Sequence, residues 1–326
     1  MSYSRLIPAL ACVLALAACG SPSASPTTTA SPSTSATPSA SATPTASVAV
    51  SSNLDAIKVT GALGKLPTVA IKSPFAIDKT RVQVLAKGTG DKAVADGYVT
   101  VNYYGAIGRT GKMFEESFSS GSTATFPLGQ VIAGFKTGLT GQQAGSRVLI
   151  AMPGADAYDA NPTGGPTDYQ VGDTLVFVVD IISVSVAGPT GKAVTPAAGL
   201  PTVSGANKPT ITIPSGDPPT KMVTQPLTEG TGDKVAKDDT IMARYVGYSW
   251  KTGKLIDDGF ATPTSGKLSD LIPGWQTGLP GKKVGSRVLL VLPPAEGFPQ
   301  GSNNPPVEAG DTVVYVIDIL FTSATA

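Results

Sequence analysis

The sequence predicts an α+β protein that contains the same domain twice, each copy built from a strongly twisted β-sheet and one short helix. The first observation is a repeat, because residues 131–153 and 271–293 share 12 of 23 positions at a constant spacing of 140. The second is composition, since 37 glycines, 28 prolines and only 14% charged residues favour short strands and many turns. A length of 326 residues also suits two domains.

The repeated segment predicts a helix followed by a buried strand. In each copy an apolar pair precedes a glycine and one large aromatic, Phe135 or Trp275, and a Gly-Leu pair ends about two turns of helix. Pro273 falls where a first helical turn tolerates proline. Gly-Ser-Arg then leads into an apolar run, residues 148–152 or 288–292, which is typical of a buried strand.

The N-terminal residues predict a targeting segment. Arg5 precedes an apolar run over residues 6–18 that is too short to span a membrane as a mature helix. The run ends in Leu-Ala-Ala-Cys19, which resembles the lipobox of bacterial lipoprotein signal peptides. We therefore expect residues 1–18 to be a signal peptide and Cys19 to be lipidated. The alternative is an ordinary cleavage site beside an incidental cysteine.

Residues 19–54 predict a disordered tether of Ser, Thr, Pro and Ala, because such a composition cannot bury enough apolar surface to offset chain entropy. With the lipid at Cys19, the tether would hold the protein on the outer face of the bacterial cytoplasmic membrane. A featureless spacer is the alternative, and O-glycosylation of this stretch stays open.

The first domain is expected to span residues 55–186. Turn signals and apolar patterns predict its strands at residues 57–59, 68–71, 81–85, 98–107, 123–128, 147–152 and 174–184. The predicted helix lies just before the strand at 147–152, and a loop is expected at residues 153–172.

Residues 187–206 are poor in charge and rich in Gly, Pro, Ala and Thr, which predicts a linker, and the second domain is expected over 207–326. The order of motifs then restarts. Gly-Thr-Gly-Asp233 and Thr-Gly-Lys254 repeat earlier turns at a spacing of 142, and Gly-Asp-Thr312 does so at 138. The falling spacing indicates small loop deletions in a duplicated domain.

The composition excludes several kinds of site. The chain has no histidine and two cysteines, Cys12 and Cys19, so the globular part holds no histidine triad, histidine zinc site or thiol pair. A net charge of +1 without a basic stripe argues against nucleic acid as a partner. We expect no metal and no cofactor. The Gly-Thr-Gly-Asp turns lack the Gly-Lys-Ser/Thr of a phosphate loop.

Several motifs in a fixed order carry a family resemblance: Val-x-Tyr-x-Gly, Thr-Gly-Lys-x-Phe-Glu-x-Ser, Leu-Gly, Val-Ile-x-Gly-Phe-x-x-Gly-Leu, Gly-Ser-Arg, Pro-x-x-x-Ala-Tyr and Gly-Asp-Thr-Leu-Val-Phe. Over residues 81–184 and 221–321 the chain resembles the FKBP family of macrolide-binding peptidyl-prolyl cis-trans isomerases, or rotamases. The resemblance implies two FKBP-like domains, each a twisted antiparallel β-sheet of about five strands wrapped over one short helix. That fold agrees with the patterns above.

The resemblance also implies an apolar, aromatic-lined pocket in the first domain, formed by Tyr103, Phe114, Glu115, Val131, Ile132, Phe135, Tyr158 and Phe177. The Ile132 backbone N–H and the Tyr158 hydroxyl would donate hydrogen bonds to substrate carbonyls. Phe135 stands where the family usually has a tryptophan, and Asp159 replaces the glycine that commonly follows the tyrosine.

The corresponding pocket of the second domain would be formed by Tyr245, Ile256, Asp257, Leu271, Ile272, Trp275, Phe298 and Tyr315. It keeps the tryptophan, but Ile256 replaces a phenylalanine and Phe298 replaces the tyrosine, so the donor hydroxyl is missing. Taken singly, strand aromatics such as Tyr245 are ordinary core residues, and only the combination predicts a pocket.

The expected function is peptidyl-prolyl isomerisation or chaperoning of proline-containing segments in secreted or cell-envelope proteins, without covalent catalysis. The resemblance adds a macrolide as a further ligand class. Two alternatives stay open at this point. The first is a binding module that holds proline segments without turnover, which the substitutions at Phe135, Ile256 and Phe298 favour. The second is a structural surface lipoprotein with decayed pockets, which the low charge and long tether favour.

Overall fold

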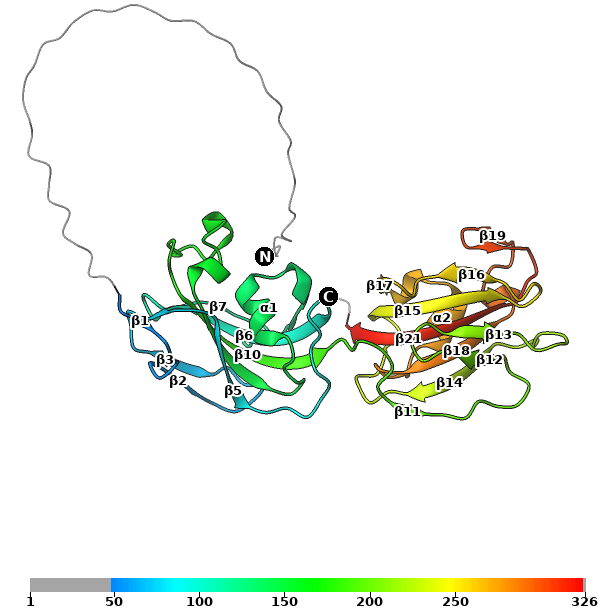
Figure 1. Ribbon diagram of the computed structural model, residues 1–326, viewed down its shortest axis with the longest axis horizontal. Helices are drawn as coiled ribbons and strands as arrows, with labels where there is room; N and C mark the ends of the chain where they lie inside the picture. The colour runs from blue at the N-terminus through cyan, green and yellow to red at the C-terminus, as the bar shows by residue number, and fades with distance from the viewer. Residues whose placement is uncertain (1–47, 325–326) are drawn as a thin grey trace, which may run out of the picture. The chain divides into compact units, whose positions relative to one another are not determined.

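The computed structural model describes residues 48–324 and contains two antiparallel sheets of matching topology, one in each domain (Figure 1). In the first sheet the strand order is β5-β9-β10-β6-β7, and β8 also pairs with β6. The strands are β5 (Arg81–Ala86), β6 (Tyr98–Ile107), β7 (Met113–Glu116), β8 (Ala124–Pro127), β9 (Arg147–Met152) and β10 (Leu175–Val184). The strand predictions for this domain are confirmed to within one or two residues.

The second sheet repeats this order as β14-β18-β21-β15-β16, with β17 on β15 and a short strand β11 added beside β14. Its strands are β11 (Lys192–Ala193), β14 (Val223–Glu229), β15 (Thr240–Ser249), β16 (Leu255–Asp258), β17 (Thr264–Lys267), β18 (Arg287–Leu292) and β21 (Val313–Ser323). A two-stranded hairpin, β19 (Ser302–Asn303) with β20 (Pro306–Val307), precedes β21.

One α-helix packs on each sheet, α1 (Ala133–Leu139) and α2 (Pro273–Gly278), as the repeat predicts. Gly134 lets α1 approach the sheet, because a Cβ there would lie 2.4 Å from the Met152 sulfur. Short 3-10 helices flank them at Leu128–Gln130, Gly154–Asp156, Pro162–Gly164, Leu268–Asp270 and Pro294–Glu296. Within residues 48–324 no helix is both long and apolar enough to cross a bilayer.

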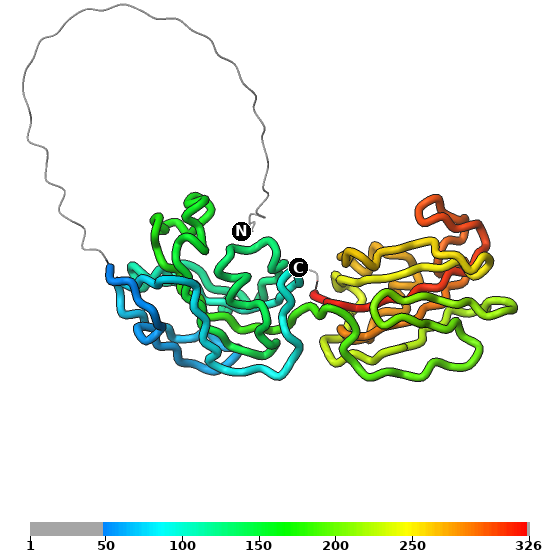
Figure 2. Tube along the Cα trace, viewed as in Figure 1, coloured from blue at the N-terminus to red at the C-terminus, as the bar shows by residue number. Residues whose placement is uncertain are grey.

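Both faces of the first sheet are covered, which is why every residue of β9 is buried. On one face α1 and the aromatics around Phe135 form a core. The other face is covered by residues 50–77, where Ile57 and Phe75 pack on Leu149 and Val178. Figure 2 shows this stretch in blue on the side of the domain away from α1.

The covering layer of the first domain has four short strands. β2 (Ile57–Thr60) and β3 (Thr68–Ile71) form a hairpin, as the sequence predicts, and β1 (Val50–Ser51) pairs in parallel with β4 (Ala76–Ile77). β1 lies inside the range assigned to the tether, so ordered structure begins before residue 55. The signal peptide, Cys19 and the tether up to residue 47 lie outside the described residues.

The range 187–206, assigned to a linker, also carries structure. β11 pairs with β14, and β12 (Thr202–Ser204) forms a hairpin with β13 (Thr210–Thr212). This hairpin covers the outer face of the second sheet, where the buried Ile211 joins the same apolar cluster as Leu289 and Val316. Each domain thus includes a hairpin from the segment that precedes its sheet.

Candidate functional site

In the first domain, four aromatic rings meet between α1 and the concave face of the sheet. Phe177 of β10 is the centre, with its ring centroid 4.7 Å from Phe135 of α1, 5.7 Å from Phe114 of β7 and 6.5 Å from Tyr103 of β6. The contacts with Phe135 and Phe114 are T-shaped, an arrangement that aromatic pairs favour. Phe135 and Phe177 are buried, whereas Tyr103 and Phe114 are half-buried, so the cluster has a closed base and an open side.

A glycine in the Val-x-Tyr-x-Gly motif makes this cluster possible. Gly105 is the register partner of Phe177 on one side and of Glu115 on the other. A Cβ on Gly105 would lie 2.6 Å from the Phe114 ring and 2.9 Å from the Phe177 ring. Only glycine therefore lets the two rings close over the strand.

Polar groups lie at the open side of the first cluster. Ile132 is the N-cap of α1, and within residues 48–324 its backbone N–H has no protein acceptor. The Tyr158 hydroxyl likewise has no protein partner in this part of the chain. Burial, with a smaller effect from the Glu115 carboxylate, raises the pKa of both Tyr158 and Tyr103, so both phenols stay protonated and able to donate.

Asp159 fixes the loop that carries Tyr158. Its Oδ1 accepts hydrogen bonds from the Tyr169 hydroxyl at 2.5 Å and from the Gly172 backbone N–H at 2.8 Å. The Tyr158 and Tyr169 rings pack in a T shape with centroids 5.8 Å apart. The aspartate that departs from the family pattern therefore anchors the loop by its two ends, and Tyr158 is held from behind by Tyr169.

The second domain has an open cavity of about 310 Å³ at the corresponding place. Three aromatic rings form its base. The ring centroid of Trp275 of α2 lies 5.1 Å from that of Tyr245 and 5.6 Å from that of Tyr315. Leu271, Ile272 and Phe298 complete the lining on the helix and loop side. As in the first domain, the N-cap N–H, here of Ile272, has no protein acceptor within the described residues.

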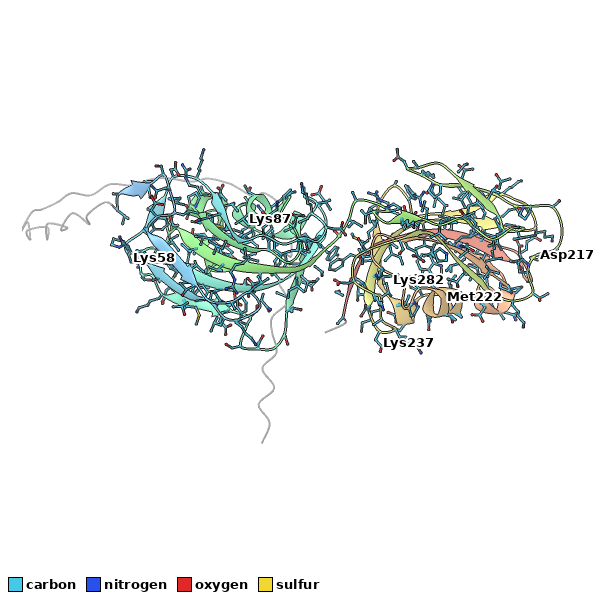
Figure 3. The ribbon with its side chains drawn as sticks, turned by 90° about the horizontal axis from the view of Figure 1, so that it is seen from below. Lys58, Lys87, Asp217, Met222, Lys237 and Lys282 are labelled. Carbon is cyan, nitrogen blue, oxygen red and sulfur yellow. The ribbon has the colours of Figure 1, made fainter. Side chains whose placement is uncertain are left out.

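The far end of α2 packs tightly on the second sheet. Met222, labelled in Figure 3, lies against this end of the helix, where a Cβ on Gly278 would lie 2.6 Å from the Met222 methyl carbon. The same Cβ would lie 2.8 Å from a methyl carbon of Leu290 on β18. This close packing holds α2, and with it the Trp275 floor of the cavity, against the sheet.

A carboxylate and a phenol face each other in the second cavity. The Tyr315 hydroxyl donates to Asp257 Oδ2 at 3.1 Å. Burial raises the pKa of Asp257, and the hydrogen bond from Tyr315 opposes that effect without cancelling it. Burial, then the neighbouring Asp257 charge, raises the pKa of Tyr315. The first domain has Phe177 at this position and makes no such bond.

The structure brings together the residues that the resemblance implies, with one exception. All eight of the first domain lie in or beside the aromatic cluster. Of the second-domain set, Ile256 packs against the core but does not line the cavity. Sequence reasoning missed Phe126, whose ring packs 5.8 Å from Phe135, and missed several lining residues of the second cavity: Ile241, Ala243, Thr264, Ser265, Gly266, Asp270, Asn304 and Pro305. Phe126 and Gly266 could have been found from the sequence, because they are 140 residues apart, which is the spacing of the repeat.

The described residues of the two sites do not form a metal site. Across residues 48–324 no three His, Cys, Asp or Glu side chains come together in a way that could hold an ion. The groups at the two sites are aromatic rings, aliphatic side chains, one or two carboxylates, phenols and a backbone N–H. Such a set can bind an apolar ring and donate hydrogen bonds to a carbonyl.

Both domains are similar to known proteins. The family model described as "FKBP-type peptidyl-prolyl cis-trans isomerase" matches residues 90–182 and again 232–320. A probable FK506-binding protein of Corynebacterium glutamicum is 34% identical over 116 residues, which is 35% of this chain and 97% of that protein. The FK506-binding protein of Streptomyces anulatus is 30% identical over 118 residues, 35% of this chain and 95% of that protein. The peptidyl-prolyl cis-trans isomerase Mip of Coxiella burnetii is 36% identical over 102 residues, 31% of this chain and 43% of that protein.

Proposed function

Because this chain belongs to the FKBP-type peptidyl-prolyl cis-trans isomerase family, we propose that both domains bind X-Pro segments and speed their cis-trans isomerisation. The observation that carries the proposal is a pair of matching sites. Each has a floor of aromatic rings and, beside it, a helix N-cap N–H that has no protein acceptor among the described residues, at Ile132 and Ile272. A proline ring fits the aromatic floor, and the N–H can hold a neighbouring carbonyl.

The chemistry needs no nucleophile. The barrier to X-Pro rotation, about 18–20 kcal/mol, comes from amide resonance, which places negative charge on the carbonyl oxygen. The twisted transition state loses that resonance and is less dipolar. An apolar site such as the Phe135–Phe177 cluster therefore stabilises the twisted amide relative to the planar one, and each 1.4 kcal/mol or so of that difference gives about tenfold in rate.

The N-terminal sequence supports a place of action outside the cytoplasm. Lipidation at Cys19 would anchor the chain to the outer face of the cytoplasmic membrane, and the tether would give the domains reach. Proline-containing segments of secreted or cell-envelope proteins are then the clients, and the protein assists their folding. Two of its relatives are named as FK506-binding proteins, which makes a macrolide a candidate competitor for the same sites.

One observation favours a second role for the second domain alone. Phe298 offers no hydroxyl where the first domain has Tyr158, and Ile256 does not reach the cavity. A site without this donor can still hold a proline segment while speeding its isomerisation less. Binding without turnover in the second domain is therefore the second candidate.

The backbone donor can be removed without disturbing the helix. Ile132 has φ −56° and ψ 147°, and Ile272 has φ −61° and ψ 150°, which proline can adopt. The residues before them, Val131 and Leu271, are extended, as a residue before proline must be. Ile132→Pro and Ile272→Pro therefore delete an N–H that bonds to none of the described residues, and they also shorten a pocket side chain. Ile132→Val and Ile272→Val shorten the side chain but keep the N–H, so they are the controls.

The test is an isomerisation assay of the full chain on a Leu-Pro peptide. Loss of a hydrogen bond of about 1 kcal/mol should slow the affected domain about fivefold, so the double proline variant should retain about a fifth of the wild-type acceleration. The valine controls should retain most of it. A wild-type chain that does not accelerate isomerisation would overturn the proposal. Full activity in the double variant would show that the Ile132 and Ile272 donors are not used.

A further inference from the structure

Among the differences between the two sites, one lies in the wall formed by β8 or β17 and comes from a single position. Phe126 on β8 pairs with Val99, and Gly266 on β17 pairs with Ile241, so the two occupy the same place in matching sheets. In the first domain the Phe126 ring packs against Phe135 with centroids 5.8 Å apart. In the second domain the matching position, Gly266, has no side chain.

The space beside Gly266 is open. A Cβ built there would touch only the end of Leu271, at 3.6 Å, and the glycine has an ordinary backbone conformation. The cavity is also lined by Ile241 and Ala243 of β15, the strand that pairs with β17, and each of these apolar residues is only 2% exposed. The part of the cavity beside Gly266, Ile241 and Leu271 thus forms a side chamber next to the Trp275 floor. In the first domain the Phe126 ring occupies the position that matches Gly266.

The entrance of this chamber is acidic. Asp257 and Asp270 both line the cavity, and the described residues that line it include no lysine or arginine. Asp270 is exposed, and the side-chain bond that it makes is a long one, 3.3 Å, from the neighbouring Ser269 hydroxyl. Gln130 occupies the matching position of the first domain, at the end of the equivalent 3-10 helix. The carboxylate at this corner is therefore a property of the second site alone.

From this shape and charge we infer that the second domain selects segments with a lysine or arginine next to the proline. The inference rests on the proposed function, because it assigns a subsite beside the proline site. A long basic side chain places its aliphatic stem on apolar surface while its cation stays at a polar rim. Here the stem would lie on Ile241 and Leu271 and the cation beside Asp270. In the first domain the Phe126 ring, packed against Phe135, occupies the matching position.

The chain provides its own probe for a binding test. Both of its tryptophans lie in the second domain, so their indole N–H signals in a ¹H–¹⁵N spectrum of the full chain report on that domain. Trp275 forms the cavity floor. Trp250 lies outside the cavity and donates to the Gly216 carbonyl, so its signal is an internal control. The ligands are Ala-Xaa-Pro-Phe peptides in which Xaa is arginine, lysine, or norleucine, an uncharged chain of similar length.

We expect the arginine and lysine peptides to shift the Trp275 signal at about two- to fivefold lower concentration than the norleucine peptide, the range of a partly exposed ion pair. The preference should shrink at high salt. Asp270→Asn should bring the ratio of the norleucine-peptide concentration to the arginine-peptide concentration close to one. Gly266→Phe, with the smaller Gly266→Leu in case the larger ring disturbs folding, should weaken all three long-chain peptides together. Asp217→Asn removes a carboxylate from an exposed loop of the same domain (Figure 3) and should leave the ratio unchanged.

The outcomes separate this inference from the proposed function. If every proline peptide shifts Trp275 but arginine and norleucine bind equally, the basic subsite is wrong and the proline site stands. The basic subsite is also wrong if Asp270→Asn and Asp217→Asn change the ratio alike. If no proline peptide shifts Trp275 and the chain does not speed isomerisation, the proline site itself fails, and the subsite fails with it.

Discussion

Replacing Arg147 with methionine should weaken the first domain by breaking a buried ion pair. Arg147 and Asp180 join β9 to β10 through bonds of 2.5 and 2.8 Å, and each side chain is only 4% exposed. Arg147 also donates to the carbonyls of Gly61 and Lys65, in the turn of the β2–β3 hairpin. The Gly64 N–H donates to Asp180 at 2.7 Å, so the pair fastens the hairpin to the sheet from both sides.

The expected loss of unfolding free energy follows from the buried Asp180 carboxylate that the substitution leaves behind. Arg147→Met leaves Asp180 buried without its cation, which costs about 3–5 kcal/mol of unfolding free energy. The carbonyls of Gly61 and Lys65 add little, since both residues are exposed and water can reach them. Removing both charges, as Arg147→Met with Asp180→Leu, should recover most of the loss, because an apolar pair of similar volume replaces a buried ion pair at small net cost.

The assay is native-state hydrogen exchange of the full chain read by mass spectrometry, which gives opening free energies segment by segment. Arg147→Met should lower protection most over residues 57–71. The second domain supplies a matched variant, since Arg287 pairs with Asp318 and donates to the carbonyls of residues 205–207, so Arg287→Met should do the same over 202–212. A loss below about 1 kcal/mol for Arg147→Met, or a double variant as weak as the single one, would refute this reasoning.

Three further outcomes are expected. Mass spectrometry of the mature protein should find an acylated Cys19 as its first residue, and an unmodified cysteine after cleavage elsewhere would rule out the anchor. In a chain that also carries Ile272→Pro, Tyr158→Phe should slow isomerisation by the first domain about fivefold. In a chain that also carries Ile132→Pro, Phe298→Tyr should speed isomerisation by the second domain. Unchanged rates in both chains would show that the phenol is not used. Burial raises the pKa of Asp257, so its charged form costs stability as pH rises through the folded pKa. Asp257→Asn should therefore be more stable than wild type at neutral pH, and the difference should vanish below the unfolded pKa near 3.8. Urea unfolding at neutral pH and below pH 3.8 measures this difference. Equal stability of the variant and wild type at neutral pH as well as at the acidic pH would contradict the prediction.

Local patterns were enough to predict the central strands and the two helices. The strand at residues 147–152 is the clearest case, since its continuous apolar run is buried on both faces. The helix bounds followed from the repeat, because glycine and proline positions constrain the backbone whatever the surroundings. Apart from Phe126, the aromatic residues of both pockets could be named in advance, because the family motifs fix their places along the chain.

Only the tertiary structure decided what lies outside those motifs. Val50–Ser51 and Thr202–Ser204 have too little apolar periodicity to predict strands, and they are ordered because a neighbouring strand and an exposed sheet face are available to them. Asp159 departs from the family pattern, and its anchoring role depends on Tyr169 and Gly172 folding back to reach it. Gly266 is an ordinary glycine in the sequence. Its role became visible only in the structure, where Gly266 pairs with Ile241 and leaves open the position that Phe126 fills in the other domain.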